Sequence, residues 1–85
     1  MCQLELYIMQ DCPTCRTAQR VAWAAARRFP SLALSIIDLD APNVIIPAEV
    51  FSAPTFRLNG RVVSLGTPEW TSLSAAIRRA LDQPT

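Results

Sequence analysis

Two cysteines separated by two residues are the feature of this sequence that most clearly could carry chemistry, in the segment Cys12-Pro13-Thr14-Cys15. A cysteine thiolate is both a nucleophile and a metal ligand, so the pair indicates either disulfide exchange or binding of a soft metal. The chain contains no histidine. An imidazole-paired cysteine mechanism, such as that of cysteine proteases, is therefore excluded within this polypeptide.

The flanking sequence places this pair where a strand ends and a helix begins. The bulky apolar run Leu4–Met9 predicts a strand covered on both faces. Pro13–Phe29 has helix-forming residues with apolar positions three and four apart, and Pro30 ends the pattern. Unpaired N–H groups at a helix N-terminus favour negative charge and lower a thiol pKa from about 8.5 to roughly 3.5–7.5. We therefore predict that Cys12 is the nucleophile.

Helical spacing also brings the second cysteine within reach of the first. Their Cβ atoms are expected about 5–6 Å apart, close enough for a disulfide after small movements. Cys12 would attack a substrate disulfide, and Cys15 would resolve the mixed disulfide, leaving a redox-active Cys12–Cys15 bridge and requiring no other cofactor. Asp11 opposes thiolate formation and Arg16 favours it, so we expect these two charges to cancel in part.

Three further strands are predicted from the rest of the chain. Leu32–Leu39 forms a strand parallel to the first, joined to it by the helix in a right-handed crossover. Thr55–Leu58 and Arg61–Leu65 are separated by Asn59-Gly60, the dipeptide that best supplies the two positive φ angles of a type I′ turn. A β-hairpin is expected there.

A second helix is predicted at the end of the chain. Thr67 would cap it with Pro68 in its first turn, and it would end at Pro84. Its apolar stripe comprises Trp70, Leu73, Ile77, Ala80 and Leu81. Between residues 40 and 53 we expect a loop with one or two helical turns near 48–51. The fold class is then α/β: β-α-β followed by β-β-α, in a four-stranded mixed sheet with flanking helices.

Size and composition set the broader expectations. The 85 residues fit a single domain, 1–85, and 51% hydrophobic with 18% charged residues is typical of a packed globular protein. A net charge of +1 gives no support for nucleic acid or an acidic membrane as partner. The N-terminus lacks the features of a signal peptide, and no apolar run approaches the ~20 residues of a membrane span. We expect a cytoplasmic monomer.

Over nearly its whole length the sequence resembles the thioredoxin superfamily, because Cys-Pro-Thr-Cys is followed by Ser52-Ala53-Pro54-Thr55, the Asn-Gly hairpin and a final helix. The resemblance implies a thiol-disulfide oxidoreductase that acts on disulfide-containing proteins and is reset by a reductase or a small-thiol donor. It also implies a cis Pro54 against the disulfide, with the Ala53 backbone pairing with the substrate. The substrate-binding residues so implied are Pro13, Thr14, Ala53, Pro54 and Thr55.

Two departures from the family pattern limit what is carried over. Leu6 stands where thioredoxins have a buried acid that assists proton transfer, and Glu5 should lie on the other face of the sheet as a solvated charge. The stretch after the hairpin, 66–70, lacks the paired acids with which glutaredoxins hold glutathione. The resemblance therefore favours a compact glutaredoxin-like thioredoxin acting on protein disulfides.

The alternative from another class is a soft-metal carrier or binding domain that holds copper or zinc through the same cysteines. A closed zinc site needs four ligands, and only Cys2 or Asp11 could add to the pair, so we expect no metal site. A redox-inactive adaptor is a third possibility, which the intact pair argues against. Cys2 is expected to be a bystander thiol, and Trp23 and Trp70 to be packing residues.

Overall fold

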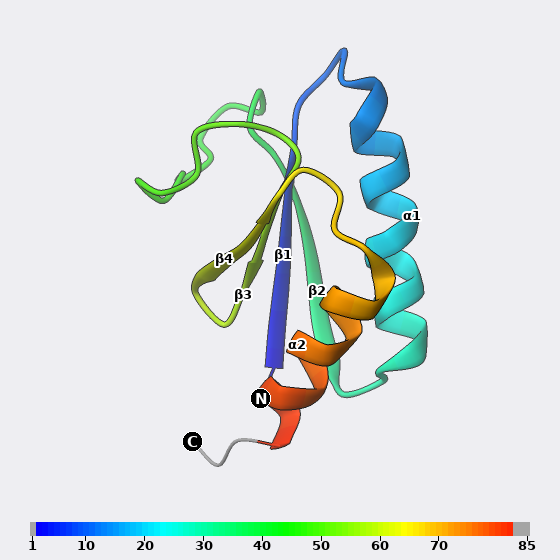
Figure 1. The fold of residues 1–85 in the computed structure, drawn as a ribbon. Helices are drawn as coiled ribbons and strands as arrows, with labels where there is room; N and C mark the ends of the chain where they lie inside the picture. Colours follow the sequence, from blue (N-terminus) through cyan, green and yellow to red (C-terminus); the bar gives the residue numbers. More distant parts are fainter. Residues whose placement is uncertain (1, 83–85) are drawn as a thin grey trace.

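The structure, a computed structural model, describes residues 2–82 and has the predicted α/β architecture (Figure 1). Its elements are β1 (Cys2–Ile8), α1 (Pro13–Arg28), β2 (Leu32–Asp38), β3 (Thr55–Leu58), β4 (Arg61–Leu65) and α2 (Trp70–Asp82). The predicted helix end at Pro84 lies outside the described residues.

The four strands form one mixed sheet in the order β2-β1-β3-β4. The first strand is parallel to β2 and antiparallel to β3, which confirms the predicted crossover and hairpin. The strand β1 begins earlier than expected because Cys2 already pairs with Leu32. At the hairpin, Asn59 and Gly60 have φ values of 49° and 83°, and the Asn59 Oδ1 atom accepts the Gln3 N–H at 2.8 Å. The turn is thereby fastened to β1.

Both helices pack on the same face of the sheet and share one apolar core. Alternate residues of β1 point into this core, because successive side chains of a strand face opposite sides. The core is made of Cys2, Leu4, Leu6, Ala18, Ala22, Ala25, Phe29, Leu32, Phe56, Leu58, Leu73 and Ile77. The three alanines allow α1 to lie close against the sheet, and this close packing fixes the N-terminus of α1 relative to the end of β1.

The other face of the sheet is contacted by the link between β2 and β3 and by neither helix. The expected helical turns near 48–51 are wrong: the only hydrogen-bonded turn described there joins the Val50 N–H to the Pro47 carbonyl at 3.0 Å. Pro54 has no N–H to donate to the Val50 carbonyl four residues earlier, so the turn does not continue as a helix. Val50 is buried, whereas Ile45 is 93% and Phe51 76% exposed. The link therefore presents apolar side chains to solvent.

The start of α2 also differs from the prediction. The helix begins at Trp70, and the Leu73 N–H donates to the Glu69 carbonyl at 3.0 Å, so Thr67 and Pro68 are neither cap nor first turn. The intervening residues are needed to carry the chain from the edge of the sheet over to its helical face (Figure 1). Trp70 is 41% and Leu81 36% exposed, so the buried stripe is narrower than expected. None of the helices in residues 2–82 has the length and hydropathy to cross a membrane.

Candidate functional site

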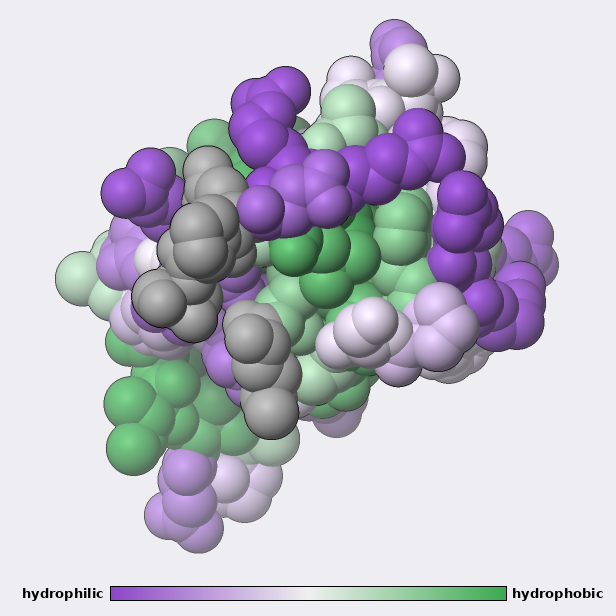
Figure 2. Space-filling model, turned by 90° about the horizontal axis from the view of Figure 1, so that it is seen from below, coloured by the Kyte–Doolittle hydropathy of each residue, from purple (hydrophilic) through white to green (hydrophobic). Residues whose placement is uncertain are grey.

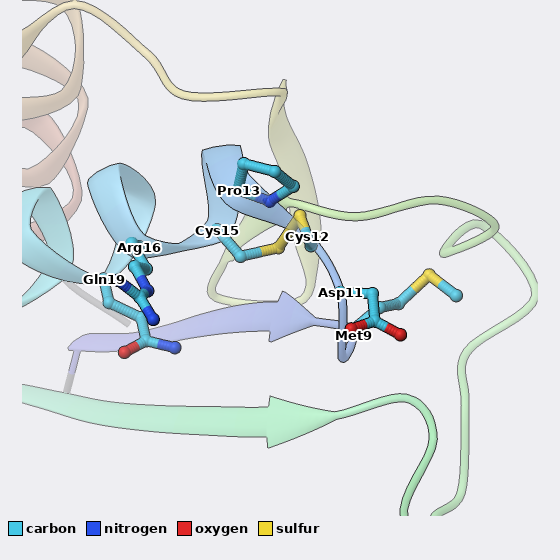
Figure 3. A pocket seen from close by; sticks show the side chains of 7 residues that line it. All are labelled: Met9, Asp11, Cys12, Pro13, Cys15, Arg16 and Gln19. Atoms are coloured by element: carbon cyan, nitrogen blue, oxygen red, sulfur yellow. A yellow bond between two sulfur atoms is a disulfide. The ribbon is translucent and has the colours of Figure 1, made fainter.

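The cysteine pair lies in the turn between β1 and α1. Asp11 has a φ of 55°, which turns the chain sharply, and Cys12 then precedes the helix with extended backbone. Pro13 occupies the first helical turn, as expected from its fixed φ. Cys12 and Cys15 form a disulfide with a Cα–Cα distance of 5.3 Å, and the Cys15 N–H donates to the Cys12 carbonyl at 3.1 Å (Figure 3).

The two sulfur-bearing residues differ in access to solvent. Cys12 is partly exposed, whereas Cys15 is only 3% exposed. The Thr14 Oγ1 atom lies 3.5 Å from the Cys12 Sγ atom, so this hydroxyl can donate to the sulfur when it is a thiolate. The first turn of α1, all of which is described, carries no acidic side chain. The helix N-terminus thus offers a negative sulfur at position 12 both a positive field and a donor.

An open cleft of about 790 Å³ adjoins the disulfide. Figure 3 shows Arg16 and Gln19 projecting from α1 on one side of it and Asp11 on the other, with the two sulfurs between. Met9, 42% exposed, adds an apolar side chain. Opposite charges flank the disulfide, as the sequence suggested, so no strong field of one sign is present here.

The second predicted motif reaches the same end of the sheet. The Ala53–Pro54 peptide bond is cis, the geometry that the family resemblance implied. Thr55, at the start of β3, pairs with Tyr7 near the end of β1 that leads to the cysteines. Its Oγ1 atom donates to the Ser52 carbonyl at 2.7 Å, and the Pro54 carbonyl accepts the Gly66 N–H at 2.8 Å. These bonds fix the loop on both sides of Pro54.

The third cysteine is far from the pair. Cys2 is in the core at the opposite end of β1, and six residue steps of about 3.3 Å each separate it from Ile8. Burial raises the pKa of its thiol, and the nearby N-terminal charge lowers it by less. Cys2 is therefore too far away to be a third ligand, and within residues 2–82 no three cysteine or carboxylate side chains gather as a metal site would require.

A polar cluster lies on the face of the sheet away from the helices, and it was not predicted. Glu5 is on this face, as alternation required, but it is not a solvated charge: its Oε1 atom accepts a 2.7 Å bond from the Arg57 Nη1 atom. The same nitrogen lies 3.4 Å from the Tyr7 hydroxyl, and the Arg57 Nε atom is 3.1 Å from Glu49 in an ion pair without hydrogen-bond geometry. Burial lowers the pKa of Arg57, but its bonds to Glu5 and Tyr7 outweigh this and leave the pKa raised.

Sequence alone gave little sign of this cluster, because the residues come from β1, β3 and the link. Only the register places them together: Glu5 pairs directly with Arg57 across the two strands. The cluster contains no sulfur and lies on the face away from α1. Its evident effect is to hold the link, through Glu49, against the strand that follows Pro54.

Comparisons with known proteins agree with this architecture. No family model matches the chain. A thioredoxin of Methanocaldococcus jannaschii is 28% identical over 81 residues, which cover 93% of this chain and 95% of that protein. Among solved structures, oxidised mitochondrial thioredoxin 3 of Saccharomyces cerevisiae superimposes with a TM-score of 0.72 at 22% identity, covering 92% of this chain and 77% of that one.

Oxidised thioredoxin of Plasmodium falciparum gives a TM-score of 0.70 at 19% identity, over 93% of this chain and 80% of that one. The two structural likenesses concern the fold, and the archaeal relative extends the similarity to the sequence over almost all of both chains. Together with the disulfide at the strand-to-helix junction, they lead to one conclusion. The chain resembles thioredoxins in sequence and in fold, and these findings support a thiol-disulfide oxidoreductase of the thioredoxin superfamily.

Proposed function

We propose that this chain exchanges its dithiol with disulfides of protein substrates, with Cys12 as the nucleophile and Cys15 as the resolving cysteine. The observation that supports these roles best is the difference in exposure. A substrate disulfide can approach the partly exposed Cys12. Cys15, 3% exposed, is reached only from within the protein, by the Cys12 sulfur of the mixed disulfide. The helix N-terminus and the Thr14 hydroxyl both favour the thiolate at Cys12 over that at a free cysteine.

The reaction proceeds in two sulfur exchanges. In the reduced protein, the Cys12 thiolate attacks one sulfur of the substrate disulfide, and the other substrate sulfur leaves as a thiolate that takes up a proton. Cys15 then loses its proton and attacks the Cys12 sulfur, and the second substrate sulfur leaves. Two electrons pass from the dithiol to the substrate, whose disulfide becomes two thiols, and the Cys12–Cys15 bridge is formed.

The substrate chain binds beside the disulfide, in contact with Pro13 and Thr14 on one side and with the partly exposed Ala53 on the other. Pro54 and Thr55 are buried, so their part in the site is to support the backbone of this second segment. Support comes from the pairing of Thr55 with Tyr7, which sets this second segment at the cysteine end of the sheet. Protein disulfides are favoured over glutathione because residues 66–70 contain one acid in place of a pair. A reductase or a small thiol returns the bridge to the dithiol.

Catalysed reduction of insulin disulfides by dithiothreitol tests this proposal. The wild-type protein should accelerate the reaction, and Cys12→Ser should abolish the acceleration. Cys2→Ala is the matched control, because it also removes a thiol but one that lies at the far end of β1, and it should retain activity. Wild-type protein that gives no acceleration, or Cys12→Ser protein that keeps it, would contradict the proposal.

A further inference from the structure

A second cleft lies at the end of the molecule away from the disulfide. It has a volume of about 500 Å³ and is formed where the β3–β4 hairpin meets α2. Its place follows from the register, since Leu58 pairs with Leu4 near the start of β1 whereas the cysteines follow its end. The lining residues are Leu58, Asn59, Arg61, Val63, Ala76, Arg79 and Ala80.

The polar groups of this cleft are donors. Arg61 enters from the hairpin and Arg79 from α2, and within residues 2–82 neither forms an ion pair. The Asn59 Oδ1 atom is occupied by the Gln3 N–H, which leaves its amide N–H groups for another partner. None of the described lining residues is acidic. The remaining wall is aliphatic, so the cleft suits an apolar group that carries or adjoins a negative charge.

The positive charge continues beyond the cleft. Arg78 is next to Arg79 on α2, and its Cζ atom lies 5.9 Å from the centroid of the Phe29 ring. The Cζ atom of Arg28, at the end of α1, lies 4.9 Å from the same centroid. Arginines from the hairpin and both helices thus lie at this end of the molecule, where Figure 2, which views the end directly, shows hydrophilic side chains around an apolar area. We call these four residues, Arg28, Arg61, Arg78 and Arg79, the basic band.

We propose that the cleft and the basic band bind an extended acidic segment of a partner protein, in which an aliphatic side chain has carboxylates two residues before and after it. Arginine suits this ligand because its planar guanidinium can bond both oxygens of a carboxylate. In an extended segment residues two apart point to the same side, so a leucine can enter the aliphatic cleft while carboxylates two residues before and after it reach Arg61 and Arg79.

Two other anionic partners fit less well. Single-stranded nucleic acid is held by bases stacked on exposed aromatic rings, but the ring at this end, that of Phe29, is buried and covered by two arginines. A membrane surface is bound by apolar side chains that project into it, but here they line a recess, and Leu58 is 6% exposed. The site is separate from the disulfide, so a partner held there leaves Cys12 free to react.

Fluorescence anisotropy of a short labelled peptide, with aspartates two residues before and after a leucine, tests the proposal at low salt. Binding should saturate, should be lost when asparagine replaces aspartate, and should weaken about tenfold or more in Arg61→Gln and in Arg79→Gln. Arg20→Gln is the matched control, since it removes the same charge from an exposed position of α1 outside the cleft and the band. It should change the affinity by less than about twofold.

Equal losses in all three variants would mean attraction by net charge alone and would overturn the proposal, as would the absence of saturable binding. Tighter binding of an oligothymidylate, or of vesicles with phosphatidylserine, would replace the proposed partner with one of these. Sedimentation of the protein alone should show a monomer. Self-association that Arg61→Gln removes would overturn the proposal, because a second copy of the chain would then occupy the cleft. Insulin reduction by Arg61→Gln should equal that of the wild type. A failure of the proposed binding site can therefore be distinguished from a failure of the proposed redox function.

Discussion

Gly66 holds the Pro54 loop in place, and its replacement should reduce activity more than the loss of stability alone explains. Its N–H donates to the Pro54 carbonyl at 2.8 Å, and its φ is +95°, where an L side chain is strained. A Cβ atom built at Gly66 would meet no atom within 4 Å, so alanine fits sterically and the cost is confined to the backbone. We expect Gly66→Ala to lower the free energy of unfolding by about 1–2 kcal/mol.

Gly60 offers a matched control at the other end of the sheet. Its φ is +83°, and a Cβ there would be 3.9 Å from the Arg57 Nη2 atom, an ordinary contact. Gly60→Ala should therefore cost a similar 1–2 kcal/mol or so, by the same backbone argument. Such losses leave a protein of ordinary stability, about 5 kcal/mol or more, almost wholly folded.

Urea unfolding of the oxidised proteins and insulin reduction by the same preparations make the comparison. Both variants should lose similar stability, but only Gly66→Ala should slow catalysis, because relief of its strain moves the N–H that holds the Pro54 loop. Equal catalytic losses in both variants would refute this reasoning, since they would show an effect of stability alone. An unchanged free energy of unfolding in Gly66→Ala would refute the strain argument.

Three further predictions concern the thiols. In the reduced protein, Thr14→Val should slow the alkylation of Cys12 at neutral pH, because the hydroxyl 3.5 Å from its sulfur is removed and less thiolate forms; an unchanged rate would contradict this. In the reduced protein at neutral pH, iodoacetamide should modify Cys12 before the buried Cys15, and mass spectrometry showing the reverse order would count against the assigned roles. Stability should fall as pH rises above 9 to 10, the ordinary pKa values of Cys2 and Tyr7, because burial raises both pKa values and only the unfolded chain then releases these protons. Urea unfolding across this range should show a smaller fall in Cys2→Ala, and a rise in wild-type stability would show the sign to be wrong.

The elements that were predicted best are those whose signals are local. Asn59 and Gly60 determine the hairpin by their own backbone preferences, and the predicted bounds of β3 and β4 are those observed. The cysteine pair was placed correctly at the start of α1 because Pro13 and the apolar periodicity mark the helix.

The errors arise where distant segments decide the local structure. The start of α2 depends on how many residues the chain needs to pass from β4 to the layer of helices. The residue types of Thr67 and Pro68 carry no information about this length. Glu5 forms an ion pair because the strand register sets Arg57 opposite it. The register was not known from the sequence, so Glu5 was predicted to be a solvated charge. The second cleft likewise requires the hairpin and α2 to be placed in space before its two arginines can be seen to share it.

Trapping of a mixed disulfide tests the central claim most directly. Reduced Cys15→Ser protein, incubated with a disulfide-containing protein and examined by non-reducing electrophoresis and peptide mass spectrometry, should accumulate a covalent adduct through Cys12. Reduced Cys12→Ser protein should accumulate little or none, because its remaining site thiol is buried. Adduct formation through Cys15 in preference to Cys12, or through neither, would contradict the account.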